Sequence, residues 1–364
     1  AALAALAAAV GAAPIELRDI PLLFADDASL ASQSGVIRTI HQARTRPAPV
    51  IEPDRPWEGD RVYTYGSLHQ DPASGRFWLW YMSRTQRPGG TSASSQLRSG
   101  GQDVVLWATS TDGVKWEKPA LGLHAYDGST ANNIVADVHS PAVVVDRFER
   151  DPAKRYKLLG YHRGGYHAFH SADGRRWHAY PKDPVFEGND TMSMTQDPRT
   201  GEFLAYFKKS SPTVPGRIVW LTRSRDMQTW SEPKLVFHPD AEDNSWSRGP
   251  DQRMEVYNMT VLPHAGGFLG LPMMFRVISR APKTVKMPPS QSGNDGPIDV
   301  QLVTSTDGEA WRRTWPRMPV IPRGAPGTFD GGTILGVTST CVHAGAESWL
   351  LYTPINTGHG GPNP

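Results

Sequence analysis

The sequence predicts an all-β fold, a five-bladed β-propeller with four-stranded antiparallel blades. Two recurring turn motifs mark the blades, and no segment carries a sustained apolar pattern of helical period. The composition agrees, because 35 glycines, 32 prolines and 12 tryptophans among 364 residues are typical of many tight turns between short aromatic strands.

The first recurring motif is Ser-x-Asp-x-x-x-Trp, which occurs at residues 110–116, 171–177, 224–230 and 305–311. Each copy follows a short β-rich run, so we interpret it as a turn between two strands. The Asp side chain can accept backbone N–H groups inside such a turn, and glycine supplies a positive φ in three of the four copies. We expect the Trp to open the next strand and to pack between neighbouring sheets.

A second turn recurs upstream of the first, at residues 71–75, 151–154, 197–201, 263–267 and 343–346. Each precedes an apolar or aromatic run, so one repeat consists of strand A, turn, strand B, linker, strand C, the Asp-containing turn and strand D. Repetition of a four-stranded unit over roughly 50–80 residues is the signature of a propeller blade. Five A–B turns therefore predict five blades.

The fifth blade is expected to be incomplete. After Ile355 the chain holds no further β-rich run from which strands C and D could form. The strand-like segments 20–24 and 36–40 are predicted to close the ring from the N-terminal side. Alternatively, the chain has been cut short at residue 364. Both explanations can be true at once.

Residues 1–13 are predicted to be a signal-peptide remnant. They are Ala-rich, apolar and uncharged, and they run into Gly-Ala-Ala-Pro, which resembles a signal-peptide cleavage site. We therefore expect residues 14–364 to form the propeller and the protein to be secreted or periplasmic; a flexible Ala-rich leader is the alternative. No later apolar run reaches about 18 residues, so no membrane partner is expected.

The charge balance excludes several function classes. With 38 basic and 36 acidic residues the formal charge is +2, which leaves no surplus of cations to neutralise a nucleic acid. The 12 histidines show no His-x3-His spacing and Gly-rich phosphate loops are absent, so we predict no metal and no cofactor. The single cysteine, Cys341, cannot form an intrachain disulfide and is expected to be a buried, inert thiol.

The candidate site follows from propeller geometry. The innermost strands line a central funnel, and the residues at their starts meet at one mouth. Carboxylates recur at this level, and glycoside hydrolysis needs two of them, a proton donor and a nucleophile or base. Crowding at the mouth can raise the pKa of the donor. The predicted catalytic residues are Asp190, Glu255 and Asp330, and the predicted substrate-binding residues are Asp27, Trp57, Glu58, Tyr65, His139 and Tyr257.

Each acidic candidate also has a structural interpretation. Asp190 follows Gly-Asn and could cap an Asx turn, while Arg253 could be the partner of a buried Glu255. Asp330 and Glu58 lie beside glycines and could shape turns, and Asp27 could cap a strand. The aspartates of the four recurring turns are predicted to be structural.

The motif set resembles a known superfamily. The Ser-x-Asp-Gly-x-x-Trp repeats resemble those of the five-bladed propeller glycosidases of families 32, 43 and 68. The likeness is greatest to bacterial proteins described as glycosyl hydrolase family 32-like, which have close counterparts of residues 23–27, 38–41, 56–59, 65–66 and 132–134. It implies a catalytic Asp, a supporting Asp placed like Asp190 and a Glu acid placed like Glu255. The family-32 signatures around the nucleophile are not found, so Asp27, Glu58, Asp137 and Asp330 all compete for that role.

These observations predict a monomeric glycoside hydrolase acting on an oligo- or polysaccharide, for example on fructofuranosyl or arabinofuranosyl units. A non-catalytic carbohydrate-binding propeller is the alternative, favoured by the missing signatures. A protein-interaction scaffold is a third hypothesis, for which wide exposed apolar patches would be expected.

Overall fold

The computed structural model describes residues 25–27, 30, 32–85, 103–264, 266–281 and 293–361. The predicted leader, 1–13, and the strand-like segment 20–24 lie outside these residues. The described part is all-β: its helical content is two single-turn 3-10 helices, η1 (Pro56–Glu58) and η2 (Pro152–Lys154). None of its helices is long and apolar enough to cross a membrane.

The described residues form four antiparallel blades, each built outward from its first strand. Blade 1 comprises β1 (Val62–Gln70), β2 (Phe77–Arg84), β3 (Asp103–Ser110) and β4 (Ile134–Ala136). Blade 2 comprises β5 (His139–Val145), β6 (Tyr156–His162), β7 (Gly165–Ser171) and β8 (His178–Ala179), with β9 (Phe186–Glu187) also paired to β7. Blade 3 comprises β10 (Met192–Gln196), β11 (Phe203–Lys208), β12 (Val219–Ser224) and β13 (Lys234–Phe237).

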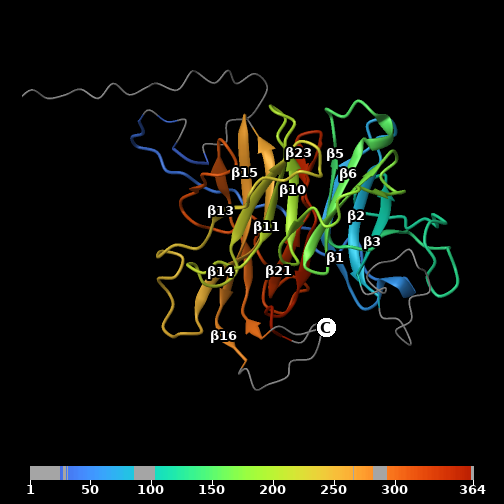
Figure 1. Cartoon of the computed structure of the whole chain (residues 1–364). Helices are drawn as coiled ribbons and strands as arrows, with labels where there is room; N and C mark the ends of the chain where they lie inside the picture. The colour runs from blue at the N-terminus through green and yellow to red at the C-terminus, as the bar shows by residue number, and fades with distance from the viewer. Residues whose placement is uncertain are drawn as a thin grey trace, which may run out of the picture.

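Blade 4 comprises β14 (Arg253–His264), β15 (Gly267–Val277), β19 (Val303–Ser305) and β20 (Arg312–Arg313), with β18 (Ile298–Val300) also paired to β15. A small two-stranded sheet, β16 (Ser279–Arg280) with β17 (Asn294–Asp295), extends from it. Figure 1 shows the blades following one another from blue β1 and β2 through green β5 and β6 to orange β15.

The prediction of five blades is wrong, because the described chain after blade 4 supplies only an A–B pair. β21 (Thr333–Val337) pairs with β24 (Tyr352–Ile355), and β22 (Val342–Ala344) pairs with β23 (Glu347–Trp349) around the expected turn. We call these four strands the closing unit. No strand forms at 36–40; the segment instead continues to Ala43, whose N–H donates to the carbonyl of Val320 at 2.7 Å.

The closing unit completes the ring. The innermost strands β1, β5, β10 and β14 contact one another in order, and β21 contacts both β14 and β1. Apolar side chains fill every junction between neighbouring sheets. The expected position of the repeat tryptophans is confirmed: Trp177, Trp230 and Trp311 pack between blades 1 and 2, 2 and 3, and 3 and 4.

The recurring Asp-containing turns have one geometry. In the copy that follows β7, Ser171 Oγ donates to Asp173 Oδ1 at 3.0 Å, and the same Oδ1 accepts the N–H groups of Arg175 and Arg176 at 2.9 Å each. Gly174 adopts φ 71° and accepts, through its carbonyl, a 2.6 Å hydrogen bond from the indole of Trp80 in blade 1. The turn therefore fixes both its own hairpin and the neighbouring blade.

Candidate functional site

Seven polar and aromatic side chains gather near the starts of the innermost strands. They come from all four blades, and each contacts at least one other member through a hydrogen bond, an ion pair or a ring. We call this set the mouth cluster: Tyr65, His139, Asp190, Lys208, Arg217, Glu255 and Tyr257.

Asp190 is the exposed carboxylate of the cluster. It lies two residues before β10, its side chain is 47% exposed, and Oδ1 is 2.6 Å from Lys208 Nζ. Partial burial alone would raise the pKa of Asp190, but Lys208, assisted by His139 and Arg217, lowers it below its usual value. Asp190 is therefore ionised at neutral pH and partly open to solvent.

Glu255 is a buried carboxylate held by two guanidinium groups. It is 1% exposed in β14, Arg217 Nη1 pairs with Oε2, and Arg253 Nε donates to Oε1 at 2.8 Å. Burial would raise the pKa of Glu255, but the two arginines lower it. The raised pKa expected of a proton donor is thus not found, whereas the expected partnership with Arg253 is confirmed.

A glycine brings the Arg217 loop onto this carboxylate. Gly216 adopts φ 83°, and a Cβ at this position would lie 2.9 Å from Glu255 Cγ. Any larger residue would therefore be strained and would push the loop away from Glu255.

Two tyrosines and a histidine form the aromatic part of the cluster. The hydroxyl groups of Tyr65 and Tyr257 are 3.2 Å apart, and the ring of His139 lies 5.7 Å from that of Tyr65. Burial and the charge of Asp190 raise the pKa of Tyr257 to about 12, so its hydroxyl stays protonated. His139 Nδ1 faces Asp103 Oδ2 at 3.6 Å.

A hollow of about 370 Å³ opens beside Asp190. It is lined by Tyr161, Asn189, Asp190, Lys208, Lys209, Ser210, Gly216 and Arg217. Polar groups with one exposed carboxylate and one aromatic ring are a composition that can hold a sugar ring and its hydroxyls.

Several predicted site residues lie elsewhere. Glu58 is fully buried in blade 1, where Oε2 accepts the N–H groups of Asp54 and Arg55 at 2.9 and 3.0 Å and Lys118 Nζ contacts Oε1 at 2.8 Å. Trp57 donates its indole N–H to Asn133 Oδ1 at 2.6 Å in the same region. Both side chains thus have partners within blade 1 and lie outside the mouth cluster, and their contact with a sugar stays a prediction.

Asp330 and Asp27 are also outside the mouth cluster. The Asp330 carboxylate accepts hydrogen bonds from Thr328 Oγ1 and Tyr352 Oη, both at 2.9 Å, so it fixes the turn before β21. Asp27 pairs with Arg38 and is 72% exposed. The competing candidate Asp137 is 6% exposed between β4 and β5 and has a partner inside the protein.

Sequence inspection missed the cations of the site. Lys208 ends β11 and Arg217 precedes β12, so both come from the second and third strands of a blade and not from the start of the first. One feature of the sequence could have indicated Lys208: a lysine ends the otherwise apolar run Phe203–Lys208. In the structure all six residues of this strand are buried.

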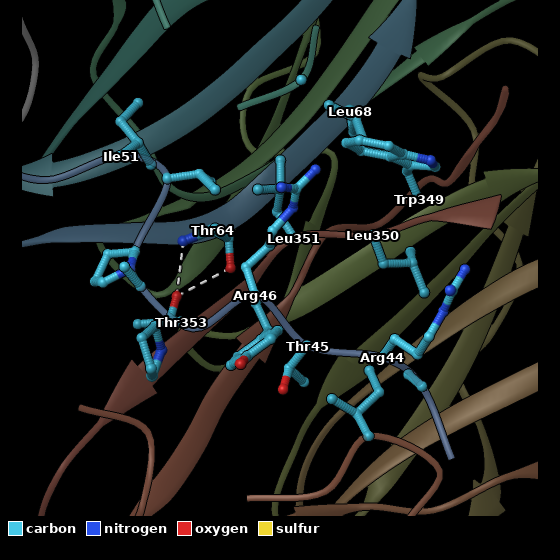
Figure 2. Close-up of a pocket in the computed structure, with 18 of the residues that line it drawn as sticks. Arg44, Thr45, Arg46, Ile51, Thr64, Leu68, Trp349, Leu350, Leu351 and Thr353 are labelled. Carbon is cyan, nitrogen blue, oxygen red and sulfur yellow. Dashed lines mark hydrogen bonds between the residues drawn. The ribbon is translucent and has the colours of Figure 1, made fainter. Parts of the chain in front are cut away.

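A second, wider cavity lies away from the mouth cluster. It measures about 610 Å³ and is bounded by residues 43–51, β1 and the closing unit (Figure 2). Figure 2 shows the hydrogen bonds between Thr64 and Thr353, two residues of its lining; the Thr64 N–H donates to Thr353 Oγ1 at 2.8 Å. Its lining is mostly apolar, and its one carboxylate, Glu347, pairs with Arg44 at 2.6 Å. This cavity lacks the paired acids that sugar chemistry requires.

Cys341 is partly buried, and its Sγ lies 3.7 Å from His343 Nε2. Burial raises the pKa of the thiol, so it stays protonated. Among the described residues, no three His, Cys, Asp or Glu side chains gather into a metal-binding group.

No family model matches the sequence, and no curated protein sequence matches it. Solved structures do share the fold. An endo-1,4-β-xylanase from Bacteroides thetaiotaomicron is 12% identical, with a TM-score of 0.51 over 80% of this chain and 84% of that one. A β-1,2-mannobiose phosphorylase from Listeria innocua is 9% identical, with a TM-score of 0.51 over 85% and 90% of the two chains.

An N-acetylgalactosamine deacetylase from F. plautii, solved with blood group B trisaccharide, is 15% identical, with a TM-score of 0.50 over 84% of this chain and 83% of that one. At such identities the likeness shows a common fold alone, which is that of the β-propeller. Membership of the family 32-like group stays a prediction.

Proposed function

We propose that the protein is a glycoside hydrolase that binds and cleaves its substrate at the mouth cluster. The observation that carries the proposal is Asp190, an ionised, half-exposed carboxylate held 2.6 Å from Lys208 beside a polar hollow. The propeller neighbours support it, because the xylanase, the phosphorylase and the deacetylase are all named for reactions of carbohydrates.

In this proposal Asp190 is the nucleophile or the general base. An ionised carboxylate suits either role, since each requires a free electron pair. Glu255 acts as a positioning residue, because both of its oxygens are paired with arginines and one of these, Arg217, lines the hollow.

The substrate and the location of the protein belong to the proposal as well. Fructofuranosides and arabinofuranosides head the substrate panel, together with xylo- and manno-oligosaccharides. We also propose export, guided by the Ala-rich residues 1–13. Recovery of the protein from culture medium or periplasm supports export, and retention in the cytoplasm contradicts it.

Replacing Asp190 by Asn tests the catalytic assignment. The variant keeps the shape and loses the charge, so we expect turnover on any cleaved glycan to fall roughly 10²-fold or more, measured by product release. Asp151→Asn is a matched control, since Asp151 is 48% exposed and faces Lys154 at 3.8 Å, outside the mouth cluster. Equal turnover by the two variants would remove Asp190 from the reaction.

A non-catalytic carbohydrate-binding propeller is the second candidate. One observation favours it: neither of the two carboxylates in the mouth cluster has the raised pKa of a proton donor. This candidate expects a glycan to bind at the hollow without release of products in long incubations. Asp190→Asn would then change affinity alone.

A further inference from the structure

The hollow beside Asp190 carries more positive than negative charge. Its lining holds three cationic side chains, Lys208, Lys209 and Arg217, and one carboxylate, Asp190. The nearby Glu255 does not restore the balance, because it is shared between Arg217 and Arg253. The site therefore keeps a surplus of cations in a protein whose formal charge is only +2 over 364 residues.

Lys208 is the most confined of these cations. Its side chain is 10% exposed, and its ammonium group has three N–H donors, of which one faces Asp190 Oδ1. The ammonium also lies 5.0 Å from the centre of the Tyr257 ring. Burial and the charge of Arg217 lower the pKa of Lys208, although Asp190 opposes them.

Arg217 also lines this hollow. Its Nη1 is paired with Glu255, while Nε and Nη2 have no hydrogen-bond partner among the described residues. Its guanidinium carbon lies 5.7 Å from the Tyr257 ring, the ring that Lys208 also approaches. A guanidinium group and an ammonium group that lie near the same aromatic ring can together donate hydrogen bonds to a planar or tetrahedral oxyanion.

We propose that Lys208 and Arg217 bind an oxyanion, so that the ligand of the hollow is an acidic carbohydrate or a carbohydrate together with inorganic phosphate. This inference rests on the proposed function for the carbohydrate part. The oxyanion accepts hydrogen bonds from the free donors of both side chains, and Asp190 stays beside the neutral part of the ligand. Lys209, 5.9 Å from the ring of Trp220, adds charge at the rim.

Titration calorimetry at fixed ionic strength tests the proposal in two arms. One arm compares glucuronate- and galacturonate-containing disaccharides with their neutral glucose and galactose counterparts. The other titrates inorganic phosphate, alone and with a neutral disaccharide. We expect at least a tenfold preference for the acidic disaccharide in the first arm, or saturable phosphate binding in the second, and the responding arm identifies the source of the oxyanion.

Variants of Lys208 connect the binding to this site. Lys208→Met should weaken binding of the anion at least tenfold, and Lys208→Arg, which keeps the charge, should stay within about threefold of the original. Lys154→Met is the matched control, because Lys154 faces an aspartate on the outer turn of blade 2 at 3.8 Å. Should Lys208→Met fail to fold, measured by circular dichroism, the Lys208→Arg protein and the pH dependence of binding carry the test.

Binding should weaken as the pH rises through the pKa of Lys208, because the ammonium loses its charge. Equal affinity for acidic and neutral sugars with no phosphate binding would overturn the inference, as would equal behaviour of Lys208→Met and Lys154→Met. Cleavage of neutral glycans without anion preference would leave the proposed hydrolase in place. Anion binding without cleavage of any glycan would instead retain the oxyanion site and remove the hydrolase.

Discussion

The two carboxylates of the mouth cluster, Glu255 and Asp190, stay ionised because each is paired with a cationic side chain. Glu255 is 1% exposed and would be costly to ionise alone, yet two guanidinium groups keep it charged. Removing one partner of such a group leaves uncompensated charge, which is why the carboxylate and its arginines act as a unit. In the same way, the positive charge of Lys208 keeps Asp190 ionised.

Replacing Glu255 by Gln should lower the free energy of unfolding at pH 7 by about 3 kcal/mol, because Arg217 and Arg253 lose their common partner. The folded-state pKa of Glu255 lies below its ordinary value of 4.5, so its contribution is complete above that pH and is lost as the pH falls through the folded-state pKa. Urea unfolding between pH 7 and pH 3 should therefore show a smaller difference between the two proteins at low pH.

The control for this experiment is Glu117→Gln. Glu117 is 68% exposed and pairs with Arg76 at 2.8 Å, so its loss should cost less than about 1 kcal/mol at either pH. A difference between wild type and Glu255→Gln that stayed constant over the whole pH range would contradict the assignment of Glu255 as an ionised, paired group.

At the scale of the element, the recurring Asp-containing turn explains how blades are joined. Three copies place glycine at a positive φ of 70°, 71° and 77°, and the fourth places Met227 there at 65°. Met227 is fully buried in the core between blades 2 and 3. In the other copies an aromatic ring from the preceding sheet packs against the glycine, as Trp80 does against Gly174. In the fourth copy the side chain of Met227, which belongs to the turn itself, supplies this packing.

Replacing Met227 by Gly should therefore destabilise the protein. Relief of the left-handed conformation returns about 1–2 kcal/mol, whereas loss of a buried methionine costs about 2–5 kcal/mol. We expect a net loss of about 2 kcal/mol in urea unfolding, because the cavity effect is the larger of the two. Gly128→Ala isolates the backbone effect, since Gly128 has φ 79° and an added Cβ would meet no atom within 4 Å. A Met227→Gly protein more stable than wild type would show that backbone strain is the larger effect.

At the scale of the whole molecule, four blades and a two-sheet closing unit make one ring. The repeats predicted the four blades and the packing of Trp177, Trp230 and Trp311, because each motif encodes a local hairpin with a fixed partner. The way in which the ring closes could not be predicted in the same way. Ring closure depends on long-range contacts of β21 with β1 and β14, for which no local motif exists.

The candidate site was only partly predictable for the same reason. Asp190, Glu255 and Tyr257 lie at or near the starts of first strands, so the repeat brings them together with His139 and Tyr65. Glu58 also precedes a first strand, but its side chain is buried in blade 1. Its carboxylate accepts hydrogen bonds there from Lys118, 60 residues away in the sequence, and from two nearby backbone N–H groups. Such distant pairing leaves no pattern in a single sequence.

A crystal structure of the Asp190→Asn protein, soaked with a glycan that the wild-type protein binds or cleaves, tests the assignment of the mouth cluster most directly. We expect a sugar ring in the hollow of the mouth cluster, within hydrogen-bond distance of residue 190, with an anionic oxygen on Lys208 or Arg217. A glycan bound instead in the cavity between residues 43–51 and the closing unit, with the mouth cluster empty, would contradict it.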